Sequence, residues 1–538
     1  MTDFSGISRR AFIAGTGGVL TAALAPSMAL TAGAEAFDVL NVAMPALGRQ
    51  VGDPTQAPTS ERVYLSLMYE WLIGCDLEAN LDKTSGLAKD WTVEEGDGET
   101  VYTVILRDGV TFQNGSPLTS EDVKFSIERF ASENSKSTYA GSLRSNVKSV
   151  EAVEPLKLVI RTAQPYAFLL YDLSRALGTE GMVMSKAYFE EAGEQAFNDA
   201  PIGTGPYRLT DLRRDTHMKF DAIEGEHWLL GKPRFDHLNI FVLPEESAAV
   251  AALKSGQVDV IEVSRQRAPD LDADGFTIFA KSGATSINLM LYGMWNPDVP
   301  LGNKKVREAL MLAIDRDAIV KGIFGGYGKI QSDGGAYGDW AVGYRAGEIY
   351  PYDPERAKAL LKEGWPQGDV TVDIDLFSRA GVPELVDAAT AIAGYWNAIG
   401  VKTNLNNTTF STFRAEMMDP AKVANHVAVQ NYGQRALVQP VQYGQFHSKG
   451  NGSKGVTPDG KVAFPELEKM IEDAAAAPDI ETYGKATADV AAYIRDEHFG
   501  GGMAEIDSLY AANPEKIAAW NLGKSPYGIR LTDVIRSR

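Results

Sequence analysis

Apolar and polar positions follow two different periods along the chain. Residues 99–106 and 370–376 alternate with a period of two, which is typical of strands, and the first run ends at the turn dipeptide Asp108-Gly109. Residues 119–130 and 385–399 instead place their apolar side chains on one face of a helix. Strand and helix patterns interleave in this way over most of the sequence, so the pattern predicts an α/β fold.

The clearest amphipathic pattern covers residues 303–324. Its apolar residues fall at positions i, i+3, i+4, i+7 and i+8, namely Val306, Ala309, Leu310, Ala313 and Ile314. This spacing predicts one long helix with one buried face. Another helix is expected to start at Asp353-Pro354, because Asp can cap a helix and Pro fits its first position.

The first 36 residues have the pattern of an export signal. Arg9 and Arg10 precede the mildly apolar segment 11–30, and small residues follow it at 31–36. The arginine pair resembles the twin-arginine type of signal, and we expect cleavage near Ala34 or Ala36. An N-terminal membrane anchor is the alternative. No later segment has the roughly 18 uninterrupted apolar residues of a membrane helix, so we expect a soluble mature protein in the periplasm.

Composition and charge exclude several classes of protein. The chain has 538 residues, 44% of them hydrophobic, which is enough for two or three domains with their own cores. The formal net charge is −19, which argues against nucleic acid or an anionic membrane surface as a partner. The single cysteine, Cys75, excludes an internal disulfide and a cysteine-based metal centre held by this chain alone.

Motifs of reaction chemistry are absent from the sequence. Gly203-Thr204-Gly205 lacks the third glycine of a dinucleotide fingerprint, and there is no phosphate-binding loop or nucleophile elbow. The six histidines have no i, i+3 or i+4 pairing, so a helix-borne metal site is not supported: His217, His227, His237, His426, His447 and His498. His217, His227 and His237 could converge in space, but scattered surface histidines are the preferred interpretation. We therefore predict no catalytic residue, no metal and no cofactor. An exported hydrolase or cofactor enzyme stays open as the alternative class, since twin-arginine export often carries folded holoproteins.

A series of short motifs carries a resemblance to a known family. They include Leu87-Ala88-Lys89-Asp90-Trp91 and Gly203-Thr204-Gly205-Pro206-Tyr207, and the others lie at 102–112, 115–129, 228–233, 252–259, 306–316 and 352–357. In this order they resemble family 5 of the extracellular solute-binding proteins of ATP-binding-cassette importers, the group of peptide, nickel and opine receptors. Gln113-Asn114 departs from the family's usual His-Asp, and we expect a changed turn without loss of function.

The resemblance implies a two-lobed periplasmic binding protein (Venus-flytrap) fold, α/β with mixed sheets, in the class with an extra domain. Domain I is expected at 37–75, 201–285 and 507–538, domain II at 76–200, and domain III at 286–506. Such a protein would be a monomeric receptor that binds a small molecule or peptide between two lobes and delivers it to a permease in the inner membrane. It would not be an enzyme.

Two arginines are candidates for a ligand carboxylate. Arg379 resembles, by its position and its spacing to Ile399-Gly400-Val401, an arginine that pairs with a peptide carboxylate in the dipeptide-binding branch. Arg435 would add a second positive contact. That branch offers an Asp to the ligand's amine in the region of 427–433, but this chain has no acid between His426 and Pro458. We therefore expect an anionic or acylated ligand, such as an opine or sugar acid, more than a free-amine peptide. An exposed loop position is the alternative for both arginines.

Aromatic residues in Gly-rich, loop-like stretches are the other candidates, with core packing as the alternative. The stretches hold Trp295, Trp340, Tyr344, Tyr432, Tyr443 and Phe446, of which Trp340 and Tyr432 are preferred because their neighbours suggest exposed backbone. Arg265 and Arg267, which follow the strand at 258–263, are expected at the surface, with a position that faces the cleft from domain I as the alternative. The predicted ligand-binding set is Arg379, Arg435, Tyr432, Trp340, Trp295 and Gln434. The sequence leaves open whether the ligand is a peptide, an opine, a sugar or a metal complex.

Overall fold

The computed structural model describes residues 38–96, 98–331, 338–379, 381–433, 435–450, 454–523 and 529–537. The predicted signal segment and Gln434 lie outside the described residues. Within these ranges, every helix is too short or too polar to span a bilayer.

A mixed sheet of eleven strands forms the largest structure within the described ranges. Its order is β15-β14-β16-β12-β17-β11-β1-β10-β9-β8, and β13 pairs with β17 off this path. The strands are β1 (Val39–Met44), β8 (Tyr207–Arg213), β9 (His217–Ala222), β10 (His237–Val242), β11 (Val260–Val263), β12 (Thr277–Leu291), β13 (Gly328–Ile330), β14 (Thr371–Leu376), β15 (Lys402–Asn407), β16 (His426–Gly433) and β17 (Gly500–Ala512). The predicted strand at 370–376 is confirmed as β14.

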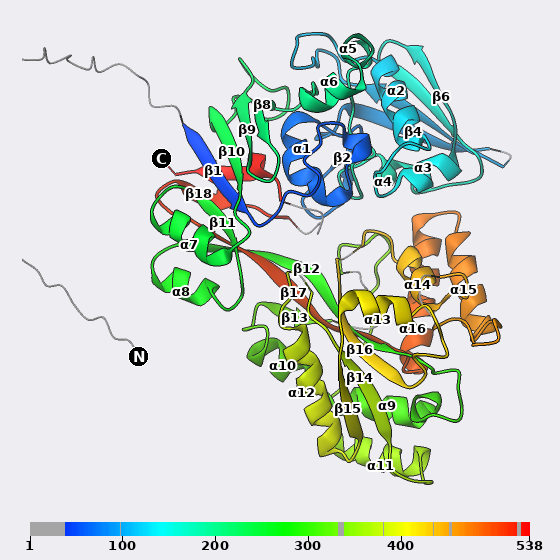
Figure 1. Ribbon diagram of the computed structural model, residues 1–538. Coiled ribbons are helices and arrows are strands. Elements are labelled where there is room, and N and C mark those ends of the chain that lie inside the picture. Colours follow the sequence, from blue (N-terminus) through cyan, green and yellow to red (C-terminus); the bar gives the residue numbers. More distant parts are fainter. Residues whose placement is uncertain are drawn as a thin grey trace, which may run out of the picture. The chain divides into compact units, whose positions relative to one another are not determined.

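Strands β12 and β17 connect the two halves of this sheet. They pair antiparallel, and Figure 1 shows them running side by side from the neighbourhood of β11 to that of β16. Their register shifts between Lys281 and Thr285, where the Gly283 backbone N–H donates to Asp507 Oδ1 at 2.9 Å. An interrupted ladder bends more easily than a regular one, so this irregularity is a natural place for a hinge.

A separate antiparallel sheet has the order β4-β5-β7-β6. It contains β4 (Ala88–Glu95), β5 (Thr100–Leu106), β6 (Val147–Glu154) and β7 (Lys157–Thr162), and the buried side chains of β5 alternate as predicted. Helix α2 (Ser120–Ala131) follows Thr119, whose backbone N–H donates to Asp122 at 2.9 Å. Two short pairs complete the strands of the described chain: β2 (Gly74–Cys75) with β3 (Leu81–Asp82), and β18 (Ile517–Trp520) with β19 (Val534–Arg536).

The other α-helices are α1 (Arg62–Met68), α3 (Ala140–Asn146), α4 (Leu169–Asp172), α5 (Lys186–Ala192), α6 (Glu194–Asp199), α7 (Glu246–Lys254), α8 (Ala268–Ala273), α9 (Lys304–Leu312), α10 (Arg316–Gly322), α11 (Pro354–Gly364), α12 (Leu385–Ala398), α13 (Phe410–Glu416), α14 (Gln439–Phe446), α15 (Pro465–Ala475) and α16 (Ile480–Asp496). Three expected helices are confirmed, among them α2 at the helix predicted for residues 119–130. Helix α11 begins at Pro354 and is capped by Asp353, and α12 leads to Gly400, whose positive φ only glycine adopts easily.

The single long helix predicted for 303–324 is wrong. The chain forms α9 and then α10, with a break at Asp315. Asp315 has extended backbone angles, and its carboxylate accepts from the Ala318 backbone N–H at 2.9 Å. An Asp that caps a new helix stops the preceding one, although the apolar spacing continues across the break.

Two large clusters of buried apolar side chains hold the described chain together. One runs from Leu40 to Val260 and is completed by residues near the C-terminus, such as Leu531 and Val534. The other lies between Ile287 and Ile506 and includes Trp396, whose indole donates to the Leu310 carbonyl. The boundaries of the three expected domains stay a prediction.

Candidate functional site

A cavity of about 540 Å³ lies beside the ends of β12 and β16. Helices α13 and α14 supply much of its wall, and the loop before α3 supplies Thr138 and Tyr139. The lining residues are Thr138, Tyr139, Met290, Tyr292, Arg414, Met417, Tyr432, Arg435, Leu437, Pro440, Val441, Gly444, Gln445 and Lys454. A cavity of this size accommodates a small organic ligand.

The cavity has a buried, apolar side and an exposed rim. Met290, Tyr292 and Met417 are buried, and the Tyr292 ring packs edge-on against Phe413 of α13. Gln430 of β16 donates to the Tyr292 hydroxyl at 3.3 Å, which fixes the ring at this position. Thioether and aromatic surfaces of this kind adapt to apolar ligand groups of different shapes.

Lys454 is the charged residue of the buried side. Its ammonium lies 3.5 Å from Met290 Sδ, 4.7 Å from the centroid of the Phe446 ring and 5.6 Å from that of Tyr292. Among the described residues no carboxylate forms an ion pair with it. Burial lowers the pKa of Lys454 to about 7, because an ammonium ion loses hydration in apolar surroundings.

The rim carries the other charges of the cavity. Arg414 and Arg435 are exposed, and no Asp or Glu occurs among the described residues that line the cavity. Burial raises the pKa of Tyr432 to about 12, although the nearby charges of Arg414 and Arg379 oppose this rise. The lining is therefore a one-sided electrostatic environment that favours an anion.

The structure brings some of the predicted ligand residues together. Arg435 and Tyr432 line the cavity, with Tyr432 on β16. Arg379 lies near Tyr432 but does not line the cavity, and its guanidinium stacks 3.7 Å from the centroid of the Phe410 ring. Its pKa is lowered by burial. Gln434 lies outside the described residues.

The predicted tryptophans lie elsewhere. Trp340 is buried with Cys75, Ala79, Ala176, Leu177 and Ala436, so the exposed surroundings expected for it are wrong. Trp295 is half-buried and does not line the cavity. The loop assignment is also wrong for Tyr443 and Phe446, which lie on α14. The glycines near Tyr443 and Phe446 do not produce a loop, because this stretch forms helix α14.

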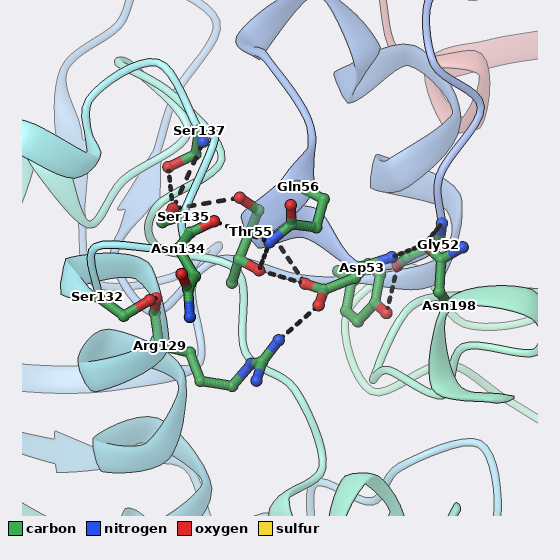
Figure 2. Close-up of polar contacts among 11 residues, drawn as sticks. Gly52, Asp53, Thr55, Gln56, Arg129, Ser132, Asn134, Ser135, Ser137 and Asn198 are labelled. Carbon is green, nitrogen blue, oxygen red and sulfur yellow. Dashed lines mark hydrogen bonds and ion pairs between the residues drawn. The ribbon is translucent and has the colours of Figure 1, made fainter. Parts of the chain in front are cut away.

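Hydrogen bonds fasten the loop that brings Thr138 to the cavity. The Thr59 backbone N–H donates to Thr138 Oγ1 at 3.0 Å, and the Lys136 N–H donates to the Thr55 carbonyl at 2.8 Å. Figure 2 shows the neighbouring contacts, in which Ser135 donates to Thr55 and Arg129 donates to Asp53. This wall of the cavity is therefore held by residues far from it in sequence.

Glu180 supports the next residue of the same loop. Its carboxylate accepts from the Tyr139 backbone N–H at 2.6 Å, and burial raises the pKa of Glu180. Sequence reasoning missed this support and the cavity residues Arg414, Gln445 and Lys454. No motif marks them, because three separate elements converge only in the folded chain.

A second cavity, of about 630 Å³, has mixed charge. Arg175, Arg234 and Arg530 line it together with the acids Asp76, Glu78, Asp82 and Asp533. Arg175 donates to the Cys75 carbonyl at 2.7 Å, and Arg530 lies 3.6 Å from Glu70. Because both signs are present, this cavity points to no single class of ligand.

The expectation of surface histidines is wrong for His217, His227 and His447, which are buried. Nε2 of His447 lies 3.3 Å from Glu472 and 3.7 Å from Glu468, the one group with metal-ligand spacing in the described ranges. However, the Lys449 backbone N–H donates to His447 Nδ1 at 3.0 Å. With Nδ1 accepting this bond, Nε2 carries a proton and donates to a glutamate, which leaves no ring nitrogen to bind a cation.

Arg265 is also not at the surface. It is buried and paired with Glu384, whereas Arg267 is exposed as expected. Arg265 lines a smaller cavity, of about 220 Å³, together with Glu246, Glu262 and Glu384. Its acids make this cavity a poor site for an anion.

Comparison with known proteins identifies the family. The family described as bacterial extracellular solute-binding proteins, family 5 Middle, matches residues 84–443. The glutathione-binding protein GsiB of Escherichia coli (strain K12) is 30% identical over 324 residues, and that of Shigella flexneri serotype 5b is 30% identical over 325 residues. Each alignment covers 59% of this chain and 60% of the relative, so the chain matches less than two thirds of the length of these proteins.

Solved structures show the same fold. HbpA2 from Haemophilus parasuis has a TM-score of 0.75 at 21% identity, over 93% of this chain and 100% of that one. NikZ from Campylobacter jejuni, solved with Ni(L-His), has a TM-score of 0.67 at 24% identity, over 92% of this chain and 99% of that one. The predicted two-lobed α/β fold with mixed sheets is thereby confirmed. The chain belongs to family 5 of the bacterial extracellular solute-binding proteins.

Proposed function

We propose that this protein is the substrate-binding receptor of an ATP-binding-cassette importer and that it binds a small anionic solute in the 540 Å³ cavity. The observation that carries this proposal is the one-sided charge of the lining: Arg414, Arg435 and Lys454 are all cationic, and no acid accompanies them among the described lining residues. A bound anion would be attracted by these basic side chains, and a cation would be repelled by them.

The same lining argues against a plain free-amine peptide. A peptide's ammonium group needs a carboxylate or several carbonyl acceptors when it is buried, and the described residues of the lining include no carboxylate. The related GsiB proteins are named for binding glutathione, and a peptide-like anion is therefore one candidate. N-acylated amino acids fit the lining better, because their amide nitrogen is uncharged. An opine keeps a protonated secondary amine, but it carries a second carboxylate.

In this proposal the receptor works outside the cytoplasm. The N-terminal twin-arginine segment would direct export and be removed near Ala34 or Ala36, and the mature monomer would act in the periplasm. Ligand binding would favour closure about the β12–β17 connection, and the inner-membrane permease would recognise the loaded state.

The direct experiment identifies the natural ligand. Protein purified from its own periplasm is denatured, and the released molecules are identified by mass spectrometry. We expect one anionic compound, which raises the melting temperature when it is added back and is recovered unchanged. Release of an unmodified dipeptide would contradict the anionic specificity. Conversion of the compound to a product would instead support the alternative of an exported enzyme.

A further inference from the structure

Building on the proposed function, we propose that the ligand is an amphiphilic carboxylate: its carboxylate pairs with Lys454 and Gln445, and its apolar part lies against Met290, Tyr292 and Met417. This assignment names both a substrate class and the residues that select it. It rests on the burial and hydrogen-bonding state of residues that line one cavity.

The first step of the argument is the position of Lys454. The residue is only 2% exposed, and its ammonium contacts a thioether and two aromatic faces. Sulfur and ring contacts replace only part of the hydration that a buried ammonium loses. Because no carboxylate of the described chain pairs with Lys454, a ligand anion is the group that would neutralise it.

Gln445 provides a second, independent observation. Its side-chain nitrogen is buried and has no hydrogen-bond partner among the described residues. Gln445 and Lys454 line the same cavity, so one ligand bound there can reach both side chains. A carboxylate has two acceptor oxygens and can serve both donors at once, which a single neutral hydroxyl does less well.

The apolar residues of the lining select the part of the ligand that is attached to its carboxylate. Met290, Tyr292 and Met417 are buried, and Leu437 and Val441 continue the apolar lining. The hydroxyl groups of a sugar acid would lose their hydrogen bonds to water against these walls, whereas an alkyl, acyl or aryl group would gain from burial. The exposed Arg414 at the rim can pair with a second anionic group of the ligand.

The test uses the full-length mature protein and titration calorimetry with four probes: N-octanoylglycine, octanoate, octanamide and gluconate. We expect the two apolar carboxylates to bind and the neutral amide and the sugar acid to bind at least about tenfold more weakly. Failure of the wild-type protein to bind either apolar carboxylate, or tighter binding of gluconate, would overturn the inference.

Two variants test the assigned residues. Lys454→Met should weaken binding of N-octanoylglycine at least about tenfold, and Lys454→Arg should recover part of it. Lys461→Met is the control, since Lys461 is exposed and pairs with Asp459 outside the cavity. Thermal unfolding of each variant checks that it is folded. Equal affinity in Lys454→Met and wild type would overturn the role of Lys454.

The natural ligand separates this inference from the proposed function. If the compound released from the periplasmic protein binds Lys454→Met as tightly as wild type, the receptor function stands and the assignment to Lys454 is wrong. If the periplasmic protein releases no small molecule and no candidate anion stabilises it, the proposed function itself fails.

Discussion

Arg265 and Glu384 form a two-point ion pair in the interior of the protein. Arg265 Nε lies 3.1 Å from one carboxylate oxygen and Nη2 lies 2.9 Å from the other. The same guanidinium donates to the Asp507 carbonyl at 2.9 Å. Arg265 follows β11, and Glu384 is the residue before α12. In the order of the sheet, β11 lies on one side of the β12–β17 pair and β14, the strand before α12 in the chain, lies on the other.

Removal of one partner of this pair should destabilise the protein. Glu384→Gln removes the ion-pair partner of a buried guanidinium, and we expect a loss of about 3 kcal/mol in the free energy of unfolding, measured in urea. Glu355→Gln is the control, because Glu355 is 81% exposed and pairs with Lys358 on the surface of α11. Its effect should be below about 0.5 kcal/mol. Equal effects of both variants would show that the buried pair adds nothing.

The glycines of the Gly203-Thr204-Gly205 motif have a packing role. A Cβ at Gly203 would lie 2.1 Å from the Met68 carbonyl oxygen, at the end of α1. Gly203→Ala should therefore force the backbones apart and lower the melting temperature by several degrees. Gly141→Ala is the matched control, since Gly141 lies in α3 with open space around it, and it should be neutral or stabilising. Similar melting temperatures for the two variants would contradict this explanation of the motif.

Asp172 should make stability depend on pH. Burial raises its pKa to about 7, against the opposing hydrogen bonds from Tyr166 and Ser142. The folded state then keeps a proton that the unfolded state releases above pH 4, so the free energy of unfolding falls as pH rises from about 4 to about 7. Asp172→Asn lacks this loss, and its stability relative to wild type should rise by a few kcal/mol over that window.

Asp459 is the control for this pH series, because its pKa is shifted in the opposite direction from that of Asp172. Asp459 is exposed, and its hydrogen bond with Lys461 lowers its pKa to about 2. Asp459→Asn should therefore change relative stability only below about pH 4 and leave it constant between pH 4 and 7. A flat profile for Asp172→Asn over the same range would show that Asp172 is ionised in the folded protein already at pH 4.

Lys454 should lower the free energy of unfolding of the ligand-free protein. Replacement by Met keeps most of the apolar stem and removes the buried ammonium, so Lys454→Met should raise the free energy of unfolding by roughly 2 kcal/mol at pH 7. The folded-state pKa of about 7 lies below that of an unfolded lysine, so wild-type stability rises between pH 7 and 10. The advantage of the variant should shrink over that range in chemical denaturation. A destabilised variant would mean that the lysine has a compensating partner.

The local patterns predicted much of the fold. Asp353-Pro354 and Gly400 mark helix ends by backbone chemistry alone, and the alternation at 99–106 records which face of a strand is buried. The helix at 303–324 shows the limit of this reasoning. Its apolar spacing continues through Asp315, but the Asp315 side chain caps α10, so the periodicity alone misses the end of α9.

The candidate site was predicted only in part. Arg435 was reached through the resemblance and the lack of acids after His426, and Tyr432 through its place in a Gly-rich aromatic stretch; both are properties of the sequence. No sequence motif identifies Lys454, because the residues around it come from other elements. Met290 lies on β12, far away in the sequence, and Phe446 lies on α14. The burial of Arg265 was missed for the same reason, since its partner is 119 residues away.

The sequence by itself determined the class of fold, the ends of several helices and the family, because these depend on periodicity, capping and ordered motifs within short stretches. Only the tertiary structure decided which charges are buried and which side chains share a cavity. The physical reason is that desolvation and ion pairing depend on distances between segments, and no local pattern specifies those distances.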